Sequence, residues 1–143
     1  MLAKLEAATL AQHAFAVVAR LEDSDWEVRH AALKTLGNLE PATLAQHAGA
    51  VLARLEDSDG WVREAALQTL GKLEPAALAQ HAVAVVAKLE DSEWRVRQAA
   101  VETLGKLEVA ALAQHEAAVR GMLENSNRGV GFAAERILEK LSM

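Results

Sequence analysis

Residues 36–69 read LGNLEPATLAQHAGAVLARLEDSDGWVREAALQT, and residues 70–103 match them at about two-thirds of positions. The tetrapeptide Leu-Ala-Gln-His occurs four times at a constant step of 34 residues: Leu10–His13, Leu44–His47, Leu78–His81 and Leu112–His115. A repeat of this length is typical of supersecondary units that stack on their neighbours, because one unit cannot bury its apolar face alone. The sequence therefore predicts an all-α array of helical units rather than one globular core.

Each unit is predicted to contain a helix A followed by a helix B. In residues 36–69, Pro41 suits the first turn of helix A, where its missing N–H costs no hydrogen bond. The apolar residues that follow are spaced as one stripe on a helix: Leu44, Ala48, Val51, Leu52 and Leu55. A continuous helix A and one that breaks near Gln46-His47 both fit this pattern.

Helix B is predicted to begin after a serine. Ser58 suits the N-cap, and in the first copy Ser24 and Glu27 match a capping box. The apolar stripe of helix B ends just before Gly71: Val62, Ala65, Ala66, Leu67 and Leu70. Stacking of both stripes predicts a single domain over residues 1–143, with repeats at about 2–35, 36–69, 70–103 and 104–143.

The composition argues against several kinds of site. Hydrophobic residues make up 52% of the chain and aromatic residues only 3%, there is no cysteine, and the net charge is -5. The chain therefore lacks disulfides and thiolate metal ligands, and the acidic balance argues against nucleic acid binding, which usually needs a basic stripe.

No targeting or membrane segment is predicted. No apolar run reaches the roughly 18 residues that a membrane span needs. The segment 7–19 recurs almost unchanged inside the chain at 41–53 and 75–87, unlike a signal peptide. We therefore expect a cytoplasmic protein that contacts no membrane and carries no cofactor.

Helix B carries a motif that identifies a family resemblance. Residues 23–37 read DSDWEVRHAALKTLG, and copies follow at 57–71 and 91–105. The tetratricopeptide pattern with its Trp, Tyr and Phe is absent. The spacing of Asp, six residues and Arg, with Val-Arg-x-Ala-Ala, instead resembles the second helix of HEAT repeats in their short form. The resemblance covers essentially the whole chain and implies an α-solenoid, a right-handed superhelix of stacked antiparallel helix pairs.

The same resemblance implies a polar ladder that ties successive repeats together. Its members are the aspartates and arginines of the first three copies: Asp23, Arg29, Asp57, Arg63, Asp91 and Arg97. In the fourth copy Asn125 replaces Asp and Gly131 replaces Arg, so that both ladder residues are lost together. Arg120 and Glu135 also replace core residues of the earlier copies. We therefore expect residues 104–143 to form a C-terminal cap.

The N-terminus shows no matching cap. Residues 2–6 read LAKLE and match the tail of a helix B, LGKLE at 70–74, without the helix that would precede it. This start is what a fragment of a longer array or an excised piece would show. The near-identity of the second and third copies fits either a recently duplicated natural array or a consensus-like, engineered one.

The candidates for chemistry are weak. His13, His47, His81 and His115 stand one repeat apart, whereas metal ligands must converge on one point. HEAT-like deoxyhypusine hydroxylases carry several His-Glu pairs, but here only His115-Glu116 is such a pair. The Asp-Ser-Asp segments lack the closing Glu of a calcium loop. We predict no catalytic residue, no metal site and no enzyme.

The positions of helix B that do not repeat give the one functional signal. Their spacing of three and four places them on one helix face, which family resemblance implies is concave. The residues are Trp26, Glu27, His30, Lys34, Trp61, Glu64, Gln68, Trp94, Arg95, Gln98, Glu102, Arg128, Phe132 and Arg136. Trp and Arg are enriched in binding hot spots, although a solvent-exposed face that drifts without constraint would also vary.

Two functions follow from these observations. The variable face predicts a non-catalytic scaffold that binds a protein or peptide partner there. The unprotected N-terminal end instead predicts a structural module that associates with itself and has no outside ligand. Fold alone would not choose between them.

Overall fold

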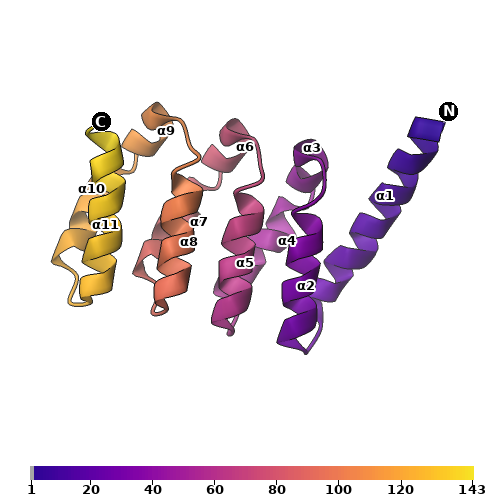
Figure 1. Cartoon of the computed structure of the whole chain (residues 1–143), viewed down its shortest axis with the longest axis horizontal. Coiled ribbons are helices and arrows are strands. Elements are labelled where there is room, and N and C mark those ends of the chain that lie inside the picture. The colour runs from indigo at the N-terminus through magenta and orange to yellow at the C-terminus, as the bar shows by residue number, and fades with distance from the viewer. Residues whose placement is uncertain (1) are drawn as a thin grey trace.

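The computed structural model describes the backbone of residues 2–143 and the side chains of residues 9 and 12–143. The described residues form α-helices and short 3-10 turns, with no strand among them. Successive helix pairs pack side by side along one axis (Figure 1), so that the prediction of an all-α solenoid is confirmed.

Four units follow one another along the chain. The first contains α1 (Leu2–Ala19) and α2 (Trp26–Leu36), and the other three each contain two short helices and a longer one. These are α3 (Pro41–Ala45), α4 (Ala48–Ala53) and α5 (Gly60–Leu70); α6 (Pro75–Ala79), α7 (Ala82–Ala87) and α8 (Trp94–Leu104); and α9 (Val109–Ala113), α10 (Glu116–Gly121) and α11 (Arg128–Leu141). A 3-10 turn precedes each long helix, at Arg20–Glu22, Arg54–Glu56, Lys88–Glu90 and Met122–Glu124.

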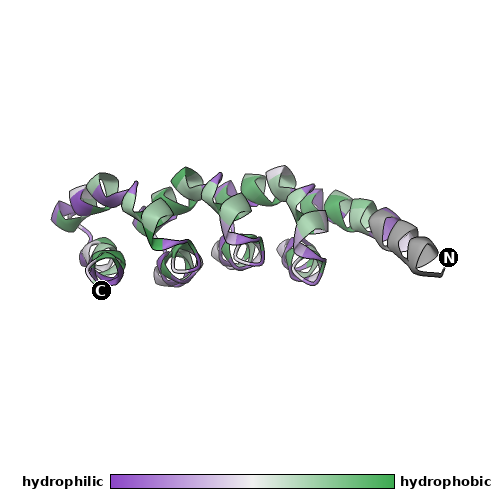
Figure 2. Cartoon of the chain, turned by 90° about the horizontal axis from the view of Figure 1, so that it is seen from above, coloured by the Kyte–Doolittle hydropathy of each residue, from purple (hydrophilic) through white to green (hydrophobic). Residues whose placement is uncertain are grey.

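The helices form two layers. Helices α2, α5, α8 and α11, here called the B helices, run parallel in one row (Figure 1). The remaining helices form the A layer, which lies on one side of that row when the chain is seen from above (Figure 2). Green, hydrophobic ribbon alternates with purple in both layers.

Helix A is broken in three of the four units. The chain leaves α-helical geometry at His47, whose φ and ψ are -112° and 10°, and does the same at His81 and His115. In the first unit the same tetrapeptide lies inside the continuous helix α1. Residues 2–6 also belong to α1, so the interpretation of them as the separate tail of a helix B is wrong.

One continuous hydrophobic core runs from Leu21 to Ile137. The predicted stripes of the second unit are buried, apart from Leu52, which is half-buried against the core. Burial of each leucine side chain stabilises the fold by roughly 1.5–3 kcal/mol. Because these leucines lie between units, most of this stabilisation belongs to the contacts between neighbours rather than to single units.

The N-caps of the B helices are not the predicted serines. Asp25 accepts a hydrogen bond from the N–H of Glu27, and Asp59 accepts from the N–H groups of Trp61 and Val62. Asn127 caps α11 in the same way through Gly129. The prediction that Ser58 caps helix B, and that Ser24 and Glu27 form a capping box, is therefore wrong by one residue.

A hydrogen bond between units was not predicted. The Thr69 hydroxyl lies between two carbonyl oxygens, that of Leu33 in the preceding unit at 2.9 Å and that of Ala65 in its own helix at 2.8 Å. The Thr103 hydroxyl donates to the carbonyl oxygen of Leu67 in the preceding unit at 3.0 Å. Each threonine is buried. The recurrence of Thr at 35, 69 and 103 was the available signal for this contact between B helices.

In the fourth unit, some side chains are exposed at repeat positions that are buried in the other units. Leu89 is fully buried, whereas Leu123 at the same repeat position is 38% exposed. Arg120 and Glu135, which replace core residues, are exposed as well. The assignment of residues 104–143 as a C-terminal cap stays a prediction.

Leu89→Ala is expected to lower the free energy of unfolding by about 2–5 kcal/mol, because it leaves a cavity between two units. Leu123→Ala, the same change at the exposed position, is expected to cost about 1 kcal/mol or less. Urea unfolding followed by circular dichroism measures both values. Equal losses in the two variants would contradict burial between units as the source of stability.

Candidate functional site

The ladder residues pair between consecutive units. The guanidinium of Arg29 donates two hydrogen bonds to the Asp57 carboxylate, at 2.9 and 3.1 Å, and Arg63 binds Asp91 in the same way. A further N–H of each arginine donates to a backbone carbonyl within its own unit, at Asp23 and Asp57. Each arginine therefore fixes the turn before its own helix and the register of the next unit.

Asp57 is the most heavily bonded carboxylate of the ladder. Its Oδ1 atom also accepts from the N–H of Asp59, and Arg54 approaches Oδ2 at 3.4 Å. Burial of this carboxyl group raises its pKa, but the hydrogen bonds and charges of Arg29 and Arg54 outweigh burial. The pKa of Asp57 is consequently held below its ordinary value.

The ladder has two ends with different chemistry. The Asp23 carboxylate accepts the N–H of Asp25 but, in the described part of the chain, pairs with no arginine. At the other end, Arg97 donates to the Asp91 carbonyl oxygen and forms no ion pair with any described residue, because Asn125 occupies the aspartate position. Arg29 and Arg63 each pair with an aspartate 28 residues later, and such an Arg–Asp pair is here called a rung. The loss of Asp at Asn125 and the loss of Arg at Gly131 therefore affect two different rungs. The sequence-based view that one rung loses both partners is therefore wrong.

Exposed aromatic side chains lie on the B helices. Trp61 is 45% exposed, and Trp94 and Phe132 are each 63% exposed. The guanidinium of Arg95 lies 3.5 Å from the ring centroid of Trp61 and 5.4 Å from that of Trp94. This cation–π contact brings together residues of the second and third units.

The other variable residues lie in the same row. A hollow of about 350 Å³ surrounds the contact between Arg95 and Trp61. Its lining also includes Glu64, Gln68, Gln98 and Glu102. Trp26 packs edge-on against His30 with ring centroids 6.1 Å apart, and Lys34 is exposed nearer the C-terminus of α2. Glu27 lies apart, because it lines a cavity between α1 and α2. Variable residues of the second and third units therefore share one hollow, and Glu27 lies outside it.

A second hollow of about 350 Å³ lies between α8 and α11. Trp94 and Phe132 line it together with Arg97, Arg128 and Arg136. The guanidinium of Arg136 donates to Gln98 Oε1 at 2.6 Å, which holds it in place. No Asp or Glu lines this hollow among the described residues.

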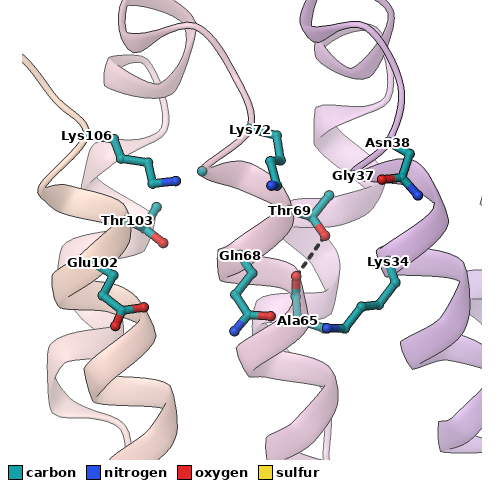
Figure 3. Close-up of a pocket in the computed structure, with 11 residues that line it drawn as sticks. Lys34, Gly37, Asn38, Ala65, Gln68, Thr69, Lys72, Glu102, Thr103 and Lys106 are labelled. Carbon is teal, nitrogen blue, oxygen red and sulfur yellow. Dashed lines mark hydrogen bonds between the residues drawn. The ribbon is translucent and has the colours of Figure 1, made fainter.

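A third cavity, of about 330 Å³, lies at the C-terminal ends of α2, α5 and α8 (Figure 3). Lys34, Lys72 and Lys106 line it with Glu102 and Gln68. A Cβ atom at Gly71 would contact the stem of Lys106, and Lys140 donates to the Gly105 carbonyl oxygen at 2.8 Å. Lysine side chains near the C-terminus of a helix are stabilised by the helix dipole. The lysines that line this cavity therefore have a structural explanation that needs no ligand.

The histidines do not converge. The imidazole ring of His47 meets Phe15 edge-on, with ring centroids 5.2 Å apart. In the part of the chain that the structure describes, no three His, Asp or Glu side chains are arranged to hold a metal ion. None of the described helices has the length and apolar character that crossing a bilayer would require.

Comparisons with known proteins agree with this architecture. A model of HEAT repeats matches residues 16–88, and a model of the single HEAT repeat matches residues 83–107. No curated protein sequence matches the chain.

Among solved structures, a designed armadillo repeat protein in complex with the peptide (KR)4 is similar at 18% identity and a TM-score of 0.69 over 96% of this chain. A second designed armadillo repeat protein (18% identity, TM-score 0.60, 87% of this chain) and an engineered protein from a structural genomics consortium (19%, 0.63, 88%) are also similar. The chain spans 61–66% of the length of these three structures. At these identities the similarity establishes the solenoid fold alone.

Asp57→Asn is expected to lower the free energy of unfolding by about 3 kcal/mol at neutral pH, because it leaves the Arg29 guanidinium without its counter-charge. Since the folded pKa is depressed, the carboxylate contributes above its unfolded pKa of about 3.9, and its contribution is lost as the pH falls through the lower folded value. Urea unfolding should therefore show the two proteins converging below about pH 4.

Asp23→Asn is the matched control. The Asp23 carboxylate makes the same local hydrogen bond but pairs with no arginine, so its loss should be within about 1 kcal/mol. Similar losses for the two variants would mean that the rung to Arg29 contributes little.

Proposed function

We propose that this chain, which belongs to the HEAT-repeat family, is a non-catalytic scaffold that binds an extended peptide or protein segment on the exposed face of the B helices. The observation that carries the proposal is the row formed by Trp61, Trp94 and Phe132, large apolar side chains left in solvent on one face. Isolated exposed apolar residues are ordinary, but a contiguous row flanked by polar groups is typical of an interaction surface.

The chemistry of the row suits peptide recognition. Tryptophan and arginine supply large contact areas with little loss of conformational freedom, which is why they dominate hot spots. The Arg95 guanidinium is already ordered between Trp61 and Trp94, so binding would not have to immobilise it. A similar designed armadillo repeat protein is known in complex with a peptide, and this supports a peptide as the class of partner.

Trp94→Ala is expected to weaken peptide binding by about tenfold or more, as the loss of a hot-spot side chain does. A random peptide array probed with labelled protein identifies binders, and fluorescence polarisation then measures their Kd. Val83→Ala is the matched control, because Val83 is an equally exposed apolar residue of the A layer. An array without binders, or binders insensitive to Trp94→Ala, would refute the B-helix face as the site.

A second candidate function is self-association, and a specific surface favours it. Ala31 and Thr35 are exposed on α2, whereas Ala65 and Thr69 at the same repeat positions are buried by the preceding unit. A hollow of about 500 Å³ beside them, lined also by Val17 and Val28, carries Arg20 and Glu27 on its walls. Two copies that pair face to face would bury this surface and can place Arg20 against Glu27 of the partner.

If two copies pair in this way, Ala31→Glu is expected to convert a dimer into a monomer, because it buries an unpaired charge in the contact. Sedimentation velocity over a wide concentration range measures the change. Ala110→Glu, an exposed alanine at the other end of the array, is the control and should leave the dimer intact. A wild-type protein that stays monomeric throughout would exclude this candidate.

A further inference from the structure

The unpaired end of the ladder opens into the hollow between α8 and α11. Arg29 and Arg63 each donate two hydrogen bonds to an aspartate carboxylate of the next unit. Arg97, the third arginine in this series, has only the Asp91 carbonyl oxygen as its hydrogen-bond acceptor among the described residues. The side of the guanidinium that binds an aspartate in the other two rungs therefore has no partner among the residues that the structure describes.

The fourth unit makes room for this guanidinium. Gly129 has no side chain, and a Cβ atom there would overlap the terminal nitrogen of Arg97. The corresponding residues of the second and third units are Trp61 and Arg95. Asn125, for its part, accepts the N–H of Asn127 and contacts Glu90 at 3.5 Å rather than Arg97.

Three guanidinium groups then share one hollow without a counter-charge. Arg97, Arg128 and Arg136 line it, with Trp94 and Phe132 as its aromatic walls. Like charges at close range repel, and each guanidinium presents a fork of donors that matches a carboxylate. The hollow therefore combines unsatisfied donors, positive charge and apolar walls.

We propose that this hollow binds an acidic side chain of the peptide partner, so that a carboxylate of the ligand completes the rung that Asn125 leaves open. The inference rests on the proposed function, since it assigns the charge preference of the same surface. A nucleic acid fits less well, because the net charge of the chain is -5 and Glu64 and Glu102 interrupt any basic stripe along the B helices. A basic peptide would meet three arginines of like sign.

The test uses three fluorescein-labelled peptides, (Glu-Leu)4, (Gln-Leu)4 and (Lys-Leu)4, titrated with the full chain. Fluorescence polarisation is expected to show (Glu-Leu)4 binding at least about tenfold more tightly than (Gln-Leu)4, with (Lys-Leu)4 weakest. Arg128→Gln, an exposed change that leaves the fold intact, should reduce this preference to about threefold or less, whereas Arg20→Gln, outside the hollow, should not.

Asn125→Asp separates binding from folding. The new carboxylate occupies the position from which Asp57 and Asp91 bind their arginines, so it should capture Arg97 and raise Tm while it weakens (Glu-Leu)4 binding about tenfold. Gln12→Glu adds the same charge at an exposed position of the first unit and should change neither value. A preference for (Glu-Leu)4 that survives Asn125→Asp and Arg128→Gln would overturn the assignment.

The outcomes also distinguish this inference from the proposed function. Equal affinities for (Glu-Leu)4 and (Gln-Leu)4, both reduced by Trp94→Ala, would overturn the acidic preference and leave the scaffold proposal standing. Absence of binding to all three peptides would overturn the inference, and the peptide array then decides the scaffold proposal separately.

Discussion

Every interior helix pair depends on its two neighbours for the burial of its apolar residues. Leu89 of the third unit is completely buried, whereas Leu123 at the same repeat position of the fourth unit is 38% exposed. In such an array the free energy of unfolding depends on the contacts between adjacent units. A single unit is therefore not stable alone. Side chains of the B helices that are not needed for stacking, such as Trp94 and Phe132, stay in solvent.

Apolar packing alone would leave the register between near-identical units poorly defined, since alanine and leucine stripes fit one another in several positions. The polar contacts are directional and remove this freedom. The Arg29–Asp57 pair and the bond from Thr69 to the Leu33 carbonyl oxygen each join two adjacent units, one near the start and one near the end of the B helices. Buried polar pairs of this kind contribute less to net stability than to the choice of one arrangement.

The sequence predicted the parts of the fold that depend on periodicity: the helix pairs, their apolar stripes and the helix ends at Gly71. It failed where two local choices have similar energies. Ser58 and Asp59 are both good N-caps, and Asp59 takes the position because Asp57 binds its N–H and shapes the turn. The break at His47 is not encoded by Leu-Ala-Gln-His, since that tetrapeptide lies unbroken in α1.

The candidate site, like the fold, was only partly predictable from the sequence. The exposed row of variable residues followed from helical spacing, but its contacts did not, because the partner of each side chain belongs to another unit. Arg95 meets Trp61 across two helices, and Arg136 binds Gln98 at a separation that no pattern within one helix reveals. The offset of 28 residues between Arg and Asp would have identified Arg97 as the arginine without a partner.

The fourth unit departs from the other three in its polar residues, and this departure bears on where the chain can bind a partner. Arg29 and Arg63 pair with Asp57 and Asp91, so these two arginines are not available to a ligand. The change from Asp to Asn at position 125 stops the ladder without leaving a buried negative charge, and it leaves the preceding Arg97 beside the exposed rings of Trp94 and Phe132. The same substitution that closes the structural series thus supplies the donors of the proposed binding hollow, which is why function is to be sought at the departures from the repeat rather than within it.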